Sequence, residues 1–220
     1  QGRNETPKFF LFPQILIATN VRKLKFGTML TPARFYAHWK EKDADTEAID
    51  AKITKIINKP IPPKIIRQID HDLLRTGDTC VAQSPCAVTE QDRGLYSLLR
   101  PERLLDLTRN FILYDNNIKK IARYPQYFAI KKALKRLKTF DKTGRRMGGL
   151  IWHTQGSGKS LTMVMLVKCL IDDSDIVLPR IVVVTDRRDL DKQISDTFAA
   201  CNIKKDVKRT RSAKELLELI

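Results

Sequence analysis

The stretch "GLIWHTQGSGKSLTMVMLVKCL", residues 149–170, decides the fold of the second half of the chain. A short apolar run, 149–152, is followed by a turn with two glycines and then by a longer apolar stretch. This order is typical of a buried strand, a tight turn and a helix. We therefore expect a strand–turn–helix unit with its turn at 153–158.

The turn has the residue types of a phosphate-binding loop. Gly156 and Gly158 lack the Cβ atoms that would block a phosphate chain, and backbone N–H groups at a helix start attract anions. Lys159 would reach the β- and γ-phosphates, and the Ser160 hydroxyl would ligate Mg²⁺. The general pattern has a glycine where His153 stands, and we interpret His153 as a residue that packs or caps the strand end. The predicted nucleotide-binding residues are Gly156, Ser157, Gly158, Lys159 and Ser160, with Lys159 as the catalytic group and Ser160 as the metal ligand.

Strands and helices alternate through the rest of this half. Residues 180–185, "RIVVVT", predict a buried strand, and the apolar spacing of 125–138, 160–173 and 187–200 predicts helices. Such alternation favours a parallel sheet with right-handed crossovers.

The first half is harder to interpret. Residues 9–31 predict strands and turns, 36–59 a helix, and 76–94 an exposed loop, while Pro101 opens a further helix. We place the main boundary near Asn116 and Asn117, and we assign no site to 41–97, which is expected to be a connector.

Charge and cysteine content narrow the class of protein. The net charge is +16, and residues 111–220 contribute +11 of it, with 23 basic and 12 acidic side chains. A basic surface of this size favours a polyanionic partner. The four cysteines have no metal-ligand spacing, which predicts thiols in a reducing compartment such as the cytoplasm. The longest early apolar stretch, 9–18, is too short to span a bilayer, so no membrane partner is expected.

Three quoted stretches together resemble one family. "GGLIWHTQGSGKSLTM", "PRIVVVTDRRDLDKQI" and "PERLLDLTRNFIL" are similar to the restriction (R) subunit of type I restriction enzymes, a superfamily 2 DNA translocase joined to a nuclease. The resemblance implies an α/β fold: a partial RecA-like P-loop parallel sheet at 118–220, preceded by a mixed α+β connector at 1–117. It also implies that the nuclease core would precede this chain and the remaining motor motifs would follow it, so we expect an internal piece of a longer protein.

The resemblance assigns further roles. It implies ATP and Mg²⁺ as cofactors, and it makes Gln126 the residue that reads the adenine edge, since an amide donates and accepts at once. It makes 185–193 similar to helicase motif Ia, which implies that Arg187 and Arg188 contact DNA and that Asp186 does not bind the metal. The implied partners are double-stranded DNA and the methyltransferase and specificity subunits of one complex.

Two other interpretations remain open. The chain fits another superfamily 2 helicase, which the sequence upstream would distinguish by lacking a nuclease motif. It also fits a non-enzymatic module that binds nucleic acid or a partner subunit, and nucleotide binding by the Lys159→Ala variant would separate that case.

Overall fold

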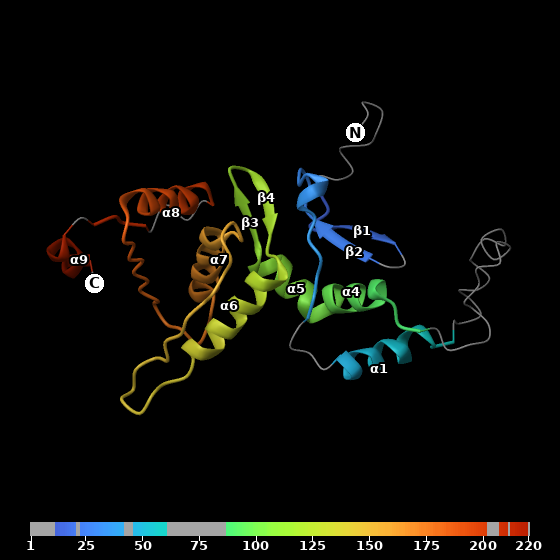
Figure 1. The fold of residues 1–220 in the computed structure, drawn as a ribbon. Coiled ribbons are helices and arrows are strands. Elements are labelled where there is room, and N and C mark those ends of the chain that lie inside the picture. Colours follow the sequence, from blue (N-terminus) through green and yellow to red (C-terminus); the bar gives the residue numbers. More distant parts are fainter. Residues whose placement is uncertain are drawn as a thin grey trace.

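The computed structural model describes residues 12–20, 23–41, 46–60, 87–201, 207–210 and 212–219. Over these residues the chain forms two separate antiparallel hairpins with helices packed around them (Figure 1). The elements are β1 (Leu16–Asn20), β2 (Lys23–Gly27), the short 3-10 helix η2 (Ala33–Phe35), α1 (Thr46–Ile57), α4 (Glu90–Leu99), α5 (Pro101–Asn110), β3 (Ile112–Asp115), β4 (Ile118–Ile121), α6 (Tyr124–Leu137), α7 (Lys159–Ile171), α8 (Arg188–Ala200) and α9 (Ala213–Leu219).

Helix α4 lies where the sequence predicted part of a loop. Its N-terminus is fixed by a capping box, in which the Thr89 hydroxyl accepts from the Asp92 N–H and the Asp92 carboxylate accepts from the Thr89 N–H. The helix packs closely on β2, because a Cβ on Gly94 would lie 3.0 Å from the Cβ of Leu24. The predicted loop at 76–94 is therefore wrong for 90–94, and 76–86 lie outside the described residues.

The β3–β4 hairpin turns at Asn116 and Asn117. Both residues have left-handed backbones, with φ of 49° and 64°, which short hairpin turns require and asparagine tolerates. The boundary that the sequence predicts between the connector, 1–117, and the motor lobe, 118–220, falls in this turn. A single cluster of buried side chains continues across it, from Leu24 and Phe26 in β2 to Phe198 in α8.

Helices α6, α7 and α8 form the frame of the second half. The helix predicted at 125–138 is confirmed as α6, in which Tyr127 and Ile130 are buried. Helix α7 packs against both α6 and α8 (Figure 1). In α7 the buried side chains include Val164, Met165 and Cys169. A hydrogen bond of 3.1 Å from Gln126 Nε2 to the Gly158 carbonyl places the start of α7 beside the start of α6.

The predicted parallel sheet is not found in the described residues. The fold is mixed α and β, but the strands of the described part form only the two antiparallel pairs. Residues 149–152 and 180–185, predicted as strands, form no ladder and expose their apolar side chains: Leu150 is 85% exposed, Trp152 86% and Val184 86%. A strand forms only where a neighbouring backbone supplies its hydrogen bonds, and no described segment pairs with either of these two in a ladder.

Among the described helices, none has both the length and the apolar composition needed to cross a membrane.

Candidate nucleotide-binding site

The turn before α7 has the backbone of a phosphate-binding loop. Gly156 and Gly158 adopt left-handed conformations, with φ of 74° and 81°, which glycine reaches without steric cost. The Ser157 N–H donates to the Thr154 carbonyl at 3.3 Å, which closes the turn. Helix α7 begins at Lys159, directly after Gly158. The loop therefore ends at a helix N-terminus, where the peptide dipoles favour an anion.

The predicted phosphate ligands lie together at this loop. The Lys159 side chain is exposed and makes no hydrogen bond or ion pair with any described residue, and Ser160 follows it in the first helical turn. The Ser157 hydroxyl is buried and has no partner within the described part of the chain. A buried polar atom without a partner is costly, so the loop fits a ligand with hydrogen-bonding oxygens.

Gln126 lies on the first turn of α6 and is 5% exposed. Its Nε2 donates to the carbonyls of Gly158 at 3.1 Å and Ser157 at 3.4 Å, and its Oε1 accepts from the Arg123 N–H at 2.9 Å. The structure thus brings Gln126 to the loop. Its role in reading adenine remains a prediction.

A cavity of about 750 Å³ opens beside the loop. One wall is the loop itself and the start of α6, including Tyr124 and Gln126. A second wall comes from the segment 34–40 in the first half of the chain, "RFYAHWK", of which every residue except Trp39 lines the cavity. The sequence interpretation gave this segment no functional role. Its aromatic and cationic composition was a visible signal, but nothing in the sequence indicated that it meets a loop more than a hundred residues later.

Two contacts hold this second wall in place. Ala37 pairs with Phe26 of β2 through backbone hydrogen bonds of 2.8 and 2.9 Å. Trp39 is buried and contacts the rings of Phe26 and Tyr127 edge-on, at centroid distances of 5.8 and 5.5 Å. Since Tyr127 follows Gln126 in α6, the same helix turn supports both walls of the cavity.

The residues expected to contact DNA precede and begin α8. Arg187 and Arg188 are exposed, and Arg187 lies 3.7 Å from the carboxylate of its exposed neighbour Asp186. The structure does not test the DNA contact.

No group of three or more His, Cys, Asp or Glu side chains in the described ranges is arranged to hold a metal ion.

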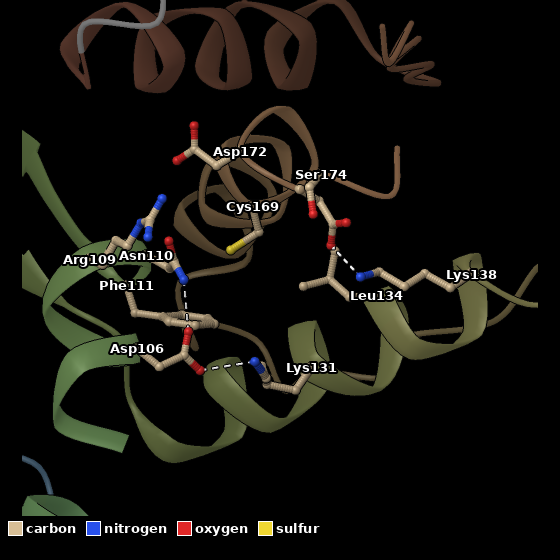
Figure 2. Close-up of a pocket in the computed structure, with 11 residues that line it drawn as sticks. Asp106, Arg109, Asn110, Phe111, Lys131, Leu134, Lys138, Cys169, Asp172 and Ser174 are labelled. Atoms are coloured by element: carbon tan, nitrogen blue, oxygen red, sulfur yellow. Dashed lines mark hydrogen bonds and ion pairs between the residues drawn. The ribbon is translucent and has the colours of Figure 1, made fainter. Parts of the chain in front are cut away.

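A second cavity, of about 380 Å³, lies between α5, α6 and α7 (Figure 2). Four of its six charged side chains are paired with one another: Lys131 with Asp106 at 3.0 Å, and Lys138 with Asp173 at 2.8 Å. Burial opposes ionisation of Asp106, but hydrogen bonds from Tyr127, Asn110 and Lys131 outweigh it and lower the pKa of this carboxyl. Burial raises the pKa of the Cys169 thiol to about 11, so the thiol stays protonated. These four charged groups thus have their partners within the cavity wall.

A glycine turn closing on a helix, with an exposed lysine at the helix start, is the arrangement of the P-loop ATPases. In agreement, residues 125–220 match the family described as SWI2/SNF2 ATPase. The second half of the chain is therefore similar to a SWI2/SNF2 ATPase over this range.

The chain is similar to endonuclease subunits of type I restriction enzymes, over 48–98% of its length. It is 43% identical over 113 residues to the HindI endonuclease subunit of Haemophilus influenzae, covering 48% of this chain and 11% of that protein. It is 28% identical over 222 residues to a Methanocaldococcus jannaschii protein named as the MjaIXP endonuclease subunit, covering 98% of this chain and 19% of that protein. A second protein of that organism, named as the MjaVIIP endonuclease subunit, is 38% identical over 137 residues, covering 57% of this chain and 13% of that protein.

These comparisons confirm the resemblance stated from the sequence: the chain is similar to type I restriction endonuclease subunits, and its residues 125–220 match the SWI2/SNF2 ATPase family. It spans 11–19% of the length of these three relatives. No solved structure shows a significant match.

Proposed function

We propose that the loop at 156–160 binds the triphosphate of ATP together with Mg²⁺. The observation that carries the proposal is the loop geometry: two left-handed glycines, a helix that starts at Lys159, and a cavity beside the turn large enough for a nucleoside. Lys159 would neutralise the β- and γ-phosphates, and Ser160 would hold the metal. Bound Mg²⁺ would supply charge neutralisation between the β- and γ-phosphate oxygens.

We further propose that residues 118–220 are the first part of a RecA-like motor lobe and that 1–117 connect it to a nuclease. In the intact protein the lobe would couple ATP hydrolysis to translocation of double-stranded DNA and to endonucleolytic cleavage. The similarity to type I restriction endonuclease subunits supports this assignment. Methyltransferase and specificity subunits would complete the complex, and the specificity subunit would select the DNA sequence.

Arg187 and Arg188 are proposed to contact DNA phosphates. Both are exposed and lie at the start of α8, in a half of the chain with a net charge of +11. Contacts of this kind position a protein on the duplex without reading its sequence.

Isothermal titration calorimetry of the 220-residue chain with MgATP tests the loop assignment. We expect saturable binding by the wild-type chain and a loss of at least tenfold in affinity for Lys159→Ala, because one charge-assisted contact contributes about 1.5–3 kcal/mol. Lys142→Ala, which removes an exposed lysine from the segment between α6 and α7, is the charge-matched control and is expected to bind as the wild type does. Equal affinities for the wild type and Lys159→Ala would contradict the assignment and favour a module that binds its partners without nucleotide.

A further inference from the structure

Gln126 is the side chain of α6 that forms hydrogen bonds with the phosphate-binding loop. The Gly158 carbonyl accepts from Gln126 Nε2 at 3.1 Å and also from the N–H and the hydroxyl of Thr162, at 3.0 and 3.1 Å. The Ser157 carbonyl accepts from the same Nε2 at 3.4 Å. With Gln126 5% exposed, these bonds are made away from water, where they are electrostatically stronger.

These carbonyls belong to the peptide units that carry the N–H groups of Gly158 and Lys159. A trans peptide is planar, so its N–H points opposite to its C=O, and the described residues contain no cis peptide. Neither N–H has a backbone acceptor in the described part of the chain, as is usual at a helix start. Gln126 therefore binds the loop from the carbonyl side and turns both N–H groups toward the opposite side.

We propose that Gln126 is a positioning residue for the phosphate-binding loop, which orients and polarises the Gly158 and Lys159 peptides so that their N–H groups receive the phosphate oxygens. A carbonyl that accepts hydrogen bonds makes the N–H of the same peptide a better donor. This inference rests on the proposed function, since it assigns a ligand to that loop.

The loop sequence agrees with this role. A Cβ on residue 158 would lie 2.9 Å from Gln126 Nε2, too close for the two to coexist without displacing the amide. Glycine at 158 therefore leaves the room that the Gln126 amide occupies, and it also adopts the φ of 81°. At Gly156, by contrast, a Cβ would meet no atom within 4 Å.

A positioning role and a role in reading the base make different predictions for a ligand without a base. If Gln126 only recognised adenine, inorganic tripolyphosphate would bind equally with or without it. If Gln126 orients the loop, tripolyphosphate, GTP and ATP all lose affinity by the same factor, because each uses the same N–H groups.

The test is calorimetric titration of the 220-residue chain with sodium tripolyphosphate, MgATP and MgGTP, well below the unfolding temperature of each variant. Gln126→Met keeps the side-chain length and removes the hydrogen bonds without adding charge. Gln126→Glu is the second variant, in case the first does not fold: it keeps the acceptor for the Arg123 N–H and loses the donor to the loop. Gln193→Met, at an exposed position of α8, is the matched control.

We expect Gln126→Met to bind all three ligands with roughly three- to tenfold lower affinity, the range of one buried hydrogen bond, and Gln193→Met to bind as the wild type does. Gln126→Glu should lose at least as much for all three ligands, because it also adds a negative charge beside the anion. A loss confined to ATP, with unchanged tripolyphosphate binding, would overturn the positioning role and leave the base-reading role. If the wild-type chain binds no ligand, or binds each as Lys159→Ala does, the proposed function itself fails and this inference with it.

Discussion

The guanidinium of Arg103 lies 2.6 Å from the carboxylate of Glu41, and each of the two side chains is only 7% exposed. The same guanidinium stacks over the rings of Trp39 and Tyr127, at 5.1 and 4.6 Å from their centroids. This contact ties the segment that forms one wall of the cavity to helix α5 and, through Tyr127, to α6.

Loss of this buried pair should destabilise the chain strongly. Arg103→Ala leaves the Glu41 carboxylate with only Arg100, at 3.0 Å, and we expect a loss of about 3–5 kcal/mol in the free energy of unfolding. Urea denaturation followed by circular dichroism measures the change. Arg109→Ala, at an exposed position of the same helix, is the control and should cost under about 0.5 kcal/mol. Equal losses for the two variants would contradict a special role for Arg103.

Three glycines with nearly equal positive φ allow the loop contact to be separated from backbone strain. Gly144, Gly156 and Gly158 have φ of 76°, 74° and 81°, but only Gly158 has a neighbour where a Cβ would stand. Each alanine variant should lose about 1–2 kcal/mol from the left-handed conformation. Gly158→Ala should in addition weaken tripolyphosphate binding, which calorimetry measures. Unchanged binding by Gly158→Ala would show that the Gln126 contact is dispensable.

The Asp106 carboxyl makes stability depend on pH. Its pKa is lowered in the folded chain: burial opposes ionisation, but hydrogen bonds from Tyr127, Asn110 and Lys131 prevail. Figure 2 shows the contacts of Asp106 with Asn110 and Lys131. The stabilisation is therefore present above the unfolded pKa of about 4 and is lost as pH falls through the lower folded value. We expect Asp106→Asn to lower the unfolding free energy by about 1–2 kcal/mol at pH 7, with the difference shrinking toward pH 2. Denaturation curves between pH 2 and 7 test this, and a difference independent of pH would contradict it.

The proposed DNA contact predicts how the affinity for DNA depends on salt concentration. Each phosphate contact adds about 0.9 to the slope of log affinity against log salt concentration, so the double variant Arg187→Ala, Arg188→Ala should lower that slope by roughly 1.8. Fluorescence anisotropy with a labelled duplex at several salt concentrations measures it. Lys52→Ala with Lys55→Ala removes the same charge from exposed positions of α1. If the Lys52→Ala, Lys55→Ala variant lowers the slope of log affinity as much as the arginine variant does, the change reflects net charge alone and contradicts the proposed contact.

Local signals predicted the parts of the fold that depend on neighbouring residues. Pro101 and the apolar spacing after Pro125 predicted α5 and α6, and the glycine turn predicted the start of α7, because helices and caps are determined within a few residues. Helix α4 was missed, although Thr89 and Asp92 have capping-box spacing, because Gly94 and the polar residues around it obscured the pattern.

Long-range relationships were beyond the sequence interpretation. The runs at 149–152 and 180–185 have strand composition, but composition cannot supply the adjacent backbone that a ladder needs. In the site, the loop residues followed from their spacing. The contact between Gln126 and Gly158 spans 32 residues and depends on how α6 packs against α7, so only the structure shows it.

The two tryptophans of the chain sit in opposite environments, and this makes them built-in optical probes. Trp39 is 6% exposed among aromatic rings, whereas Trp152 is 86% exposed and lines the cavity beside the glycine turn. Trp39 should emit at short wavelength and Trp152 at long wavelength with ready quenching by acrylamide. Replacing either one by phenylalanine would leave a single fluorophore, reporting on the interior from Trp39 or on occupancy of the cavity from Trp152.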